Sequence, residues 1–455
     1  MVFATNFVLT ADLWRLFRIC GVLAGMVGVS SAWSLDLRQA YDAAYANDAA
    51  IRAARAVAQS ERELLPQATA QRLPNVSLSA SRNHNDLTSK TQSLLGPRTD
   101  ENRYYSGNQS LTVRQPLYRP YLSALVRQAT AQVEGADATL EREEQSLVTR
   151  VGEAYFDALL AEDQLRLVNV QKTTYTAQLD AARKRLAAGS GTRTDIDEAQ
   201  AQLDMTVAQE LEARQNMDYT RRRLEVLTGS SVDTLAGLDV QRFAPSVPVP
   251  ESIEAWTERA EAASPELQAL RAQFEAARHE IDKAQAGHKP TLDVVAQWSR
   301  TNSDSVTSVN QRYDNKVIGL QLTVPIYAGG YVSSTVRQAV ARAERAREAL
   351  EAARLDLGVR VHREFRGVTE GVLRIRALEQ AVKSADQAVI SNRKSFEAGS
   401  RTMLDVLNAE QQKTVAQRDL AQARYVYLVS RLRLQSLAGD DRNASVSEAN
   451  AWLLQ

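Results

Sequence analysis

The tripeptide Ala188-Gly189-Ser190 recurs 210 residues later (398 − 188) as Ala398-Gly399-Ser400. Each copy ends one long helical pattern and precedes a shorter one, so each is expected to be the turn of a helical hairpin. Val126-Arg127-Gln128-Ala129 recurs at the same distance as Val336-Arg337-Gln338-Ala339. The chain therefore contains two copies of one unit. Such a duplication predicts an assembly with rotational pseudosymmetry and argues against a catalytic pocket.

Each copy predicts a long outgoing helix and a return helix. The outgoing helices are expected at about 120–188 and 331–398, where apolar residues recur at the coiled-coil spacing of three and four. A helix of that length is roughly 100 Å long, and only packing against neighbours can stabilise its apolar stripe. The return helices are expected to end near Thr228 and Leu437. The predicted hairpin turns contain Gly189, Gly191 and Gly399.

Each copy also contains two strand-like stretches in which apolar and polar residues alternate. In the first copy they are expected at 74–81 and 111–118, separated by a polar loop that runs to about Arg103. In the second copy they are expected at 292–298 and 318–326, again with a polar loop between them. Strand-to-helix turns are predicted at Pro116, Pro325, Gly329 and Gly330.

Four strands with one apolar and one polar face leave two unpaired edges in an open sheet. Unpaired edges are not tolerated in hydrocarbon, so strands whose apolar faces meet lipid must close into a barrel with other copies of the chain. Three copies would give twelve strands, with polar side chains such as Ser77, Ser79, Gln321 and Thr323 facing a wet lumen. Tyrosines and Trp298 beside the strands suit a membrane interface. The alternative is a soluble sheet packed on helices.

Composition excludes several classes of function. The 455 residues include 55 basic and 55 acidic side chains, so the chain has no electrostatic footprint for nucleic acid. Its four histidines are scattered and no phosphate-binding loop occurs, so we expect no metal, no cofactor and no enzymatic activity. The only cysteine, Cys20, lies in the predicted leader, so the mature chain is expected to lack disulfides. Energy for any transport must therefore come from a partner.

The sequence divides into five expected segments. Residues 1–32 read as a signal peptide, because Arg15 and Arg18 precede an apolar run that is too short to span a bilayer. The first repeat covers 33–228 and the second covers 251–438. Residues 229–250 contain three prolines and are expected to be an irregular connector. The polar tail at 439–455 is expected to be loosely ordered.

Three motifs give the sequence a resemblance to the TolC family of outer-membrane efflux and secretion channels, over residues 35 to 440. The first is Leu322-Thr323-Val324-Pro325-Ile326-Tyr327-Ala328-Gly329-Gly330. The second is the tip sequence Gly399-Ser400-Arg401-Thr402-Met403-Leu404-Asp405-Val406-Leu407-Asn408-Ala409. The third is the late run Ala421-Gln422-Ala423-Arg424-Tyr425-Val426-Tyr427-Leu428. Each motif alone is weak, and together they are specific.

The resemblance implies a mainly helical homotrimer with a twelve-stranded barrel in outer-membrane lipid and a helical tunnel across the periplasm. An equatorial belt would contain residues 229–250 and the tail after Gly439. The implied partners are a periplasmic adaptor and an inner-membrane transporter, either ABC-type or proton-driven. The implied role is type I protein secretion, multidrug efflux, or both. Two rivals remain: a periplasmic adaptor, which usually carries a single hairpin, and a structural coiled-coil rod, which needs no amphipathic strands.

The resemblance also implies a gate at the hairpin tips. By motif position, Arg401 is the gate arginine, and Thr194 and Asp195 are its partners in the first copy. The family's gate tyrosine is replaced here by Phe396, which removes a hydroxyl. These residues are expected to hold the tunnel shut until a pump or adaptor releases them. Without the resemblance, Arg401 and Asp195 would read as an ordinary solvated pair at a hairpin tip.

A selectivity constriction is expected beside the gate. The family has a ring of paired aspartates there, and this chain has Asp405 at the first position and Asn408 at the second. Three Asp405 carboxylates around a threefold axis would repel one another and attract cations.

Overall fold

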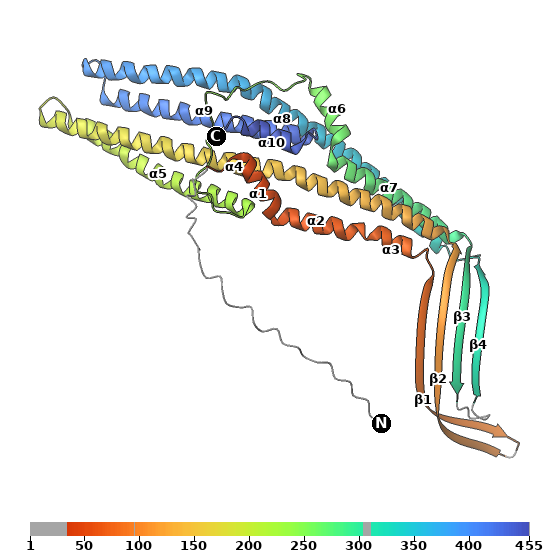
Figure 1. Cartoon of the computed structure of the whole chain (residues 1–455). Helices are drawn as coiled ribbons and strands as arrows, with labels where there is room; N and C mark the ends of the chain where they lie inside the picture. The colour runs from red at the N-terminus through yellow and green to blue at the C-terminus, as the bar shows by residue number, and fades with distance from the viewer. Residues whose placement is uncertain (1–33, 95, 304–310, 455) are drawn as a thin grey trace, which may run out of the picture.

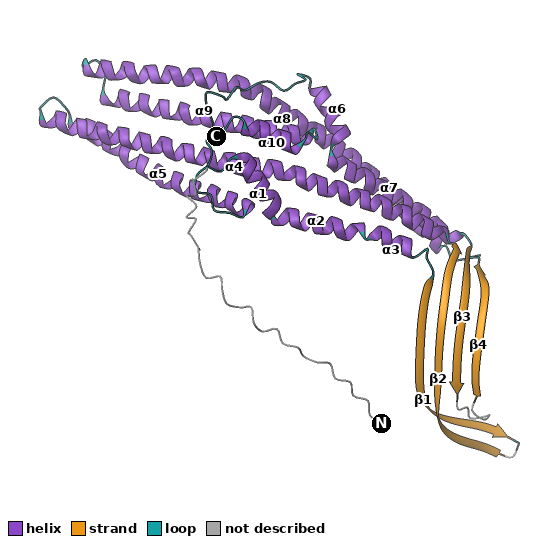
Figure 2. Cartoon of the chain, in the orientation of Figure 1, coloured by secondary structure: helices purple, strands orange, loops and turns teal. Residues whose placement is uncertain are grey.

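The computed structural model describes residues 34–94, 96–303 and 311–454, and the predicted signal peptide lies outside them. A long body of helices carries a four-stranded sheet at one end (Figures 1 and 2). The first half contains α1 (Leu37–Asn47), α2 (Ala49–Arg62), α3 (Leu64–Ala70), β1 (Asn75–Ser93), β2 (Gly96–Tyr118), α4 (Pro120–Ala187) and α5 (Arg193–Thr228). The second half contains α6 (Ile253–Ala263), α7 (Pro265–Gln285), η1 (Ala286–His288), β3 (Thr291–Ser303), β4 (Gln311–Thr323), α8 (Tyr331–Glu397), α9 (Met403–Leu437) and α10 (Arg442–Asn450).

The two predicted helical hairpins are confirmed. Helices α4 and α5 form the first and α8 and α9 the second, and both reach the end of the molecule opposite the sheet (Figure 1). Gly152 lies within α4 and faces α9. A Cβ at this position would be 2.6 Å from Leu432 Cδ1. Glycine at that position therefore permits close approach of the two hairpins and does not break the helix.

The main core lies midway along the helices, where both hairpins meet the N-terminal helix and the connector. Tyr155 of α4 is fully buried there, and its hydroxyl oxygen lies 2.9 Å from the carbonyl oxygens of Leu35 and Ala236. The Ala236 carbonyl belongs to the irregular connector and the Leu35 carbonyl to the segment before α1, so the Tyr155 hydroxyl joins both segments to α4.

The prediction of a loosely ordered C-terminal tail is wrong. Residues Arg442–Asn450 form α10, with Asp441 accepting a hydrogen bond at its N-terminus. Val446 and Ala449 are buried in the main core, and Leu453 pairs with Leu238 of the connector. Helix α10 is mostly polar, but its short apolar face packs in the main core beside the connector.

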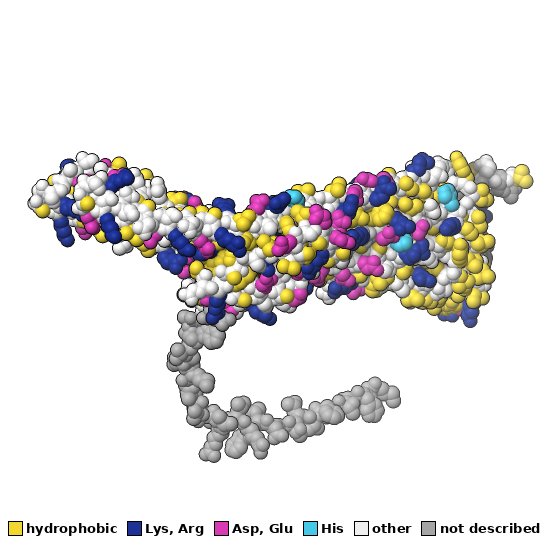
Figure 3. Space-filling view, turned by 90° about the horizontal axis from the view of Figure 1, so that it is seen from above, with side chains coloured by type: hydrophobic (Ala, Val, Ile, Leu, Met, Phe, Trp, Pro, Cys, Tyr) yellow, Lys and Arg dark blue, Asp and Glu magenta, His cyan; other side chains and the backbone are white. Residues whose placement is uncertain are grey.

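The sheet is antiparallel in the order β1-β2-β3-β4. Register aligns Val76, Val113, Ala296 and Ile318 across the four strands, so one face of the sheet is apolar. Many of these side chains are exposed in the single chain; Ile318 is 79% exposed and Leu320 is 70% exposed. Seen from above, apolar side chains gather over the sheet end of the molecule (Figure 3). The other face is polar, and the Ser79 and Ser110 hydroxyl oxygens lie 2.7 Å apart there.

The prediction of a polar loop between the first two strands is wrong, because most of that segment is paired β-strand. Strands β1 and β2 stay paired to Ser93 and Gly96, and beyond the Ser106–Ser303 pair they form a ribbon that has no third strand beside it among the residues the structure describes. Cross-strand polar contacts support the ribbon; Asn85 Nδ2 donates to Ser106 Oγ at 2.9 Å. A ribbon exposed on both faces does not need alternating apolar residues, so the alternation used to predict strands did not detect it.

The strand ends also differ from prediction. Pro116 lies inside β2, where the register shifts between Pro116 and Tyr118, and the turn into α4 is the single residue Arg119. Strand β4 ends at Thr323, so Pro325 lies in the irregular segment that follows it. Gly329 and Gly330 occupy the turn into α8 with φ of 58° and 81°, a left-handed conformation that favours glycine.

Among the described residues, none of the helices combines the length and apolar character needed to cross a membrane.

Candidate functional site

The two hairpin tips are built alike. Gly189 and Gly399 have φ of 75° and 76°, and each ends its long helix in a left-handed turn. Gly191 is needed for a different reason, because a Cβ there would lie 2.9 Å from the Leu186 amide nitrogen. The duplicated sequence therefore produces duplicated turn geometry.

Both return helices begin with a capping box. In α5, the Asp195 amide donates to Thr192 Oγ1 at 3.2 Å, and the Thr192 amide donates to Asp195 Oδ2 at 3.0 Å. In α9, Thr402 and Asp405 repeat the arrangement, and the Asp405 amide donates to Thr402 Oγ1 at 3.3 Å. Hydrogen bonds from the Thr402 amide and hydroxyl lower the pKa of Asp405, with a smaller contribution from Arg401. Each tip aspartate therefore has a structural role in its own hairpin.

The structure does not bring the predicted gate partners together within one chain. Arg401 lies in the turn just before α9, and its Nη1 is 3.5 Å from Oδ1 of Asp405 in the first turn of that helix. Thr194 is exposed in the first turn of α5 and is not the cap. No hydrogen bond or ion pair within the described part of the chain joins Arg401 to Thr194 or Asp195. Asn408 is exposed three residues after Asp405, so the two side chains share one face of α9.

Phe396 has a defined environment that the sequence did not predict. It packs against a small apolar cluster that contains Tyr175 of α4 with Met403 and Leu407 of α9. The guanidinium carbon of Arg185, on the last turn of α4, lies 4.4 Å from the centre of the Phe396 ring. No sequence signal marked Tyr175 or Arg185, because each lies on a helical face of ordinary composition.

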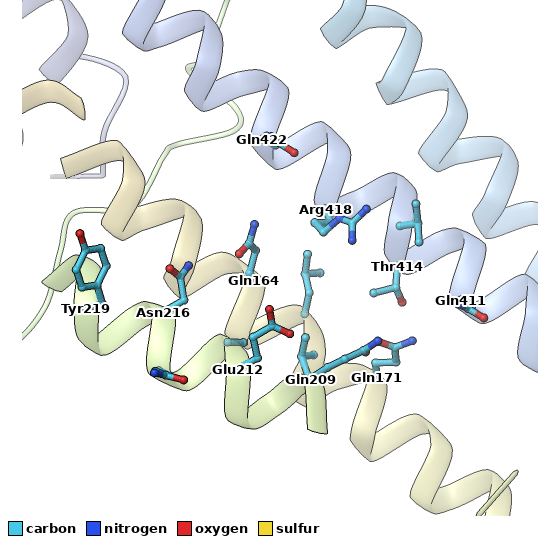
Figure 4. Close-up of a pocket in the computed structure, with 15 residues that line it drawn as sticks. Gln164, Gln171, Gln209, Glu212, Asn216, Tyr219, Gln411, Thr414, Arg418 and Gln422 are labelled. Carbon is cyan, nitrogen blue, oxygen red and sulfur yellow. The ribbon is translucent and has the colours of Figure 1, made fainter. Parts of the chain in front are cut away.

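A groove separates the hairpins between the main core and the tips. It encloses about 800 Å³ between α4, α5 and α9 (Figure 4). Nearly half of the residues that line it have amide side chains: Gln164, Gln171, Gln209, Gln215, Asn216, Gln411 and Gln422. Glu212 and Arg418 face it from opposite hairpins.

A second unpredicted group lies where the sheet joins the helices. Asp293 of β3 is 3% exposed and accepts a hydrogen bond from Arg119 Nε at 2.7 Å. Arg114 Nη1 lies 3.8 Å from the same carboxylate. Arg119 is the single residue between β2 and α4, so this pair ties the start of α4 to the neighbouring strand β3. No group of three or more metal-ligating side chains converges among the described residues.

Comparison with known proteins identifies the family. The model of the family described as "Outer membrane efflux protein" matches residues 40–230 and 256–440. The proteases secretion protein PrtF of Dickeya chrysanthemi is 32% identical, over 96% of this chain and 93% of that protein. The alkaline protease secretion protein AprF of Pseudomonas aeruginosa is 34% identical, over 92% of this chain and 88% of that protein.

The fold has a counterpart among solved structures. The outer membrane protein VceC of Vibrio cholerae superposes with a TM-score of 0.76 at 20% identity, over 89% of this chain and 96% of that chain. The chain belongs to the outer membrane efflux protein family, as its resemblance to TolC-type channels predicted, and is an export channel of the outer membrane.

Proposed function

We propose that three copies of this chain form a periplasm-spanning duct for type I protein secretion. The observation that carries the proposal is a sheet with one apolar face and two free edges, attached to helical hairpins that are apolar only along stripes. One chain cannot close either layer, whereas three copies would give a twelve-stranded barrel and a ring of hairpins. The protease secretion relatives favour protein cargo over drugs.

The duct is proposed to be passive and not enzymatic. The described residues contain no convergent metal-ligating group, and the sequence contains no phosphate-binding loop. Transport energy would come from an inner-membrane transporter, coupled through a periplasmic adaptor that contacts the helical body. The family comparison supports an outer-membrane channel, and duplication of both strand pairs and hairpins disfavours the adaptor and rod alternatives.

We also propose that Arg401, Thr194 and Asp195 form the gate only when the tips of different chains meet. In one chain Arg401 reaches its own Asp405, and Asp195 is exposed enough at the tip to meet a neighbour. Opening would then need the tips of neighbouring chains to separate.

Single-channel recording in planar bilayers tests the proposal. The purified full chain should run as a heat-sensitive trimer in detergent and form low-conductance pores. Arg401→Ser should raise the conductance, because it removes the positive partner of the intersubunit link. Arg418→Ser, which changes an arginine in the groove well away from the tip, is the control and should conduct like wild type. A soluble monomer that never inserts would refute the channel, and unchanged conductance in Arg401→Ser would refute the gate alone.

A further inference from the structure

The tips of the two hairpins are tied together within one chain by very few contacts. Ionic contacts near the tips run inside a hairpin: Lys172 with Glu210 in the first, and Arg393 with Glu410 and Lys413 with Asp386 in the second. Moving from the core toward the tips, the last hydrogen bond in the described chain that joins the hairpins runs from the Tyr425 hydroxyl to Asp163 Oδ2, at 2.8 Å. The amide-lined groove follows it.

Beyond the groove, the hairpins touch again at the small apolar cluster. Tyr175 is fully buried against Met403 and Leu407, and Leu203 of α5 and Phe396 of α8 complete the cluster from both sides. All four long helices therefore contribute to it. Its few side chains bury far less apolar surface than the main core, so the tips can separate without disrupting that core.

Arg185 covers this cluster at the end of the first hairpin. Its guanidinium carbon lies 4.4 Å from the centre of the Phe396 ring, within the range of a cation–π interaction. Arg185 Nη1 is shielded from water and has no hydrogen-bond partner among the described residues, so the ring is the contact that compensates this end of the guanidinium. Removal from water strengthens the attraction of a cation to an aromatic face.

The backbone of Arg185 is also held in place. Its carbonyl oxygen accepts a hydrogen bond from the Ser190 amide at 3.0 Å, across the hairpin turn. A Cβ on Gly191 would lie 3.0 Å from Arg185 Cβ, so the turn packs directly on this residue. The Arg185 side chain therefore extends toward Phe396 of the second hairpin from backbone that the turn holds in place.

We propose that Arg185 and Phe396 form a cation–π latch that holds the two hairpin tips of one chain together and biases the duct toward its resting state. The latch rests on the proposed function, because it restrains the hairpin separation that opening requires. It assigns a role to Phe396, whose missing hydroxyl left that position without a predicted partner. It also gives a role to Arg185 of the first hairpin, whose guanidinium holds the Phe396 ring of the second hairpin in place.

The test compares full-length variants in planar bilayers. Arg185→Gln and Phe396→Leu should each raise the ratio of open to closed channels by about 2- to 30-fold, which corresponds to the energy of one cation–π contact. Combining both changes should add little to either one, because each already removes the same contact. Phe396→Tyr and Arg185→Lys keep the ring or the charge and should remain close to wild type.

Lys184→Gln is the matched control, since it removes the same charge from the exposed neighbouring residue. Equal opening in Lys184→Gln and Arg185→Gln would overturn the latch, because net charge alone would then explain the effect. Full additivity of Arg185→Gln and Phe396→Leu would also overturn it. If Arg401→Ser opens the channel while Arg185→Gln and Phe396→Leu do not, the latch is refuted and the proposed function stands. A wild-type chain that forms no pore refutes both.

Discussion

At the scale of single residues, the Asp405 carboxylate at the tip of the second hairpin is held by several contacts at once. Asp405 accepts hydrogen bonds from the amide and hydroxyl of Thr402, the N-cap of α9, and its Oδ1 lies 3.5 Å from Nη1 of Arg401 in the preceding turn. These contacts fix the carboxylate at the start of the helix, where the helix dipole also favours negative charge. A side chain held this firmly is suited to present its charge at a defined point of a narrow passage.

The first prediction concerns this charge. Asp405→Ala should reduce the preference of the pore for cations and weaken block by divalent cations, measured as reversal potential and current in asymmetric salt. Asp197→Ala is the control, because Asp197 is an exposed carboxylate paired with Arg193 on the other return helix. Equal loss of selectivity in both variants would contradict a specific role for Asp405.

The pH dependence of the same site follows from the lowered pKa of Asp405. A carboxylate whose folded pKa is depressed contributes stability above its unfolded pKa, and that contribution is lost as the pH falls through the folded pKa. In the unassembled chain, amide protection in the first turn of α9 should therefore persist below the ordinary aspartate range and be lost only at lower pH. Hydrogen exchange of the detergent-solubilised single chain over an acid series would check this. Loss of protection above that range would contradict it.

At the scale of elements, α10 shows how a short helix fastens the middle of the molecule. Its Arg442 pairs with Glu144 of α4, its Glu448 pairs with Arg431 of α9, and its apolar face enters the main core. Burial raises the pKa of nearby Asp440 despite the adjacent Arg259, so this half-buried side chain is partly shielded from water. The helix thus connects both hairpins at the level of the connector.

The second prediction tests this docking. Val446→Asp should destabilise the folded protein by about 3 kcal/mol, because it places an unpaired charge at a buried position. Asn443→Asp adds the same charge three residues earlier on an exposed face of α10 and should change stability by less than about 0.5 kcal/mol. Thermal unfolding followed by circular dichroism measures both. Equal midpoints for the two variants would show that α10 does not contribute to the core.

At the scale of the whole molecule, the exposed apolar face of the sheet decides where the chain can reside. Ile318, Leu320 and Leu322 alternate along β4 and are all more than half exposed, while Gln321 points to the opposite face. A single chain in water would leave this surface uncovered. Lipid on the outside and a closed ring of strands remove both the apolar surface and the free edges.

The third prediction distinguishes the two faces. Leu320→Arg should impair insertion into liposomes, because an arginine on the lipid side of a barrel is destabilising, by about 2–4 kcal/mol at the bilayer midplane and by less toward the interfaces. Gln321→Arg is the matched control, since the next residue faces the lumen and should insert normally. Flotation of liposomes with bound trimer measures insertion. If Gln321→Arg were the more damaging change, the apolar face would not be the lipid face.

The amino-acid sequence alone was sufficient to predict the elements whose patterns repeat locally. The three-and-four spacing of α4 and α8, the paired turns at Gly189 and Gly399, and the one-sided alternation of β4 were all readable, because each depends on neighbouring residues along one element. The duplication predicted a symmetric assembly, and the three motifs gave the resemblance to the family and its channel function.

Features that depend on contacts between segments distant in the chain could not be predicted from the sequence and are seen only in the folded structure. The docking of α10, the buried Asp293 with Arg119, and the contact of Arg185 with Phe396 each join segments far apart in sequence. The paired ribbon beyond Ser106 likewise depends on cross-strand contacts between polar residues, which leave no periodic signal. Burial and pairing are properties of the surface that a distant segment supplies, so no local pattern could specify them.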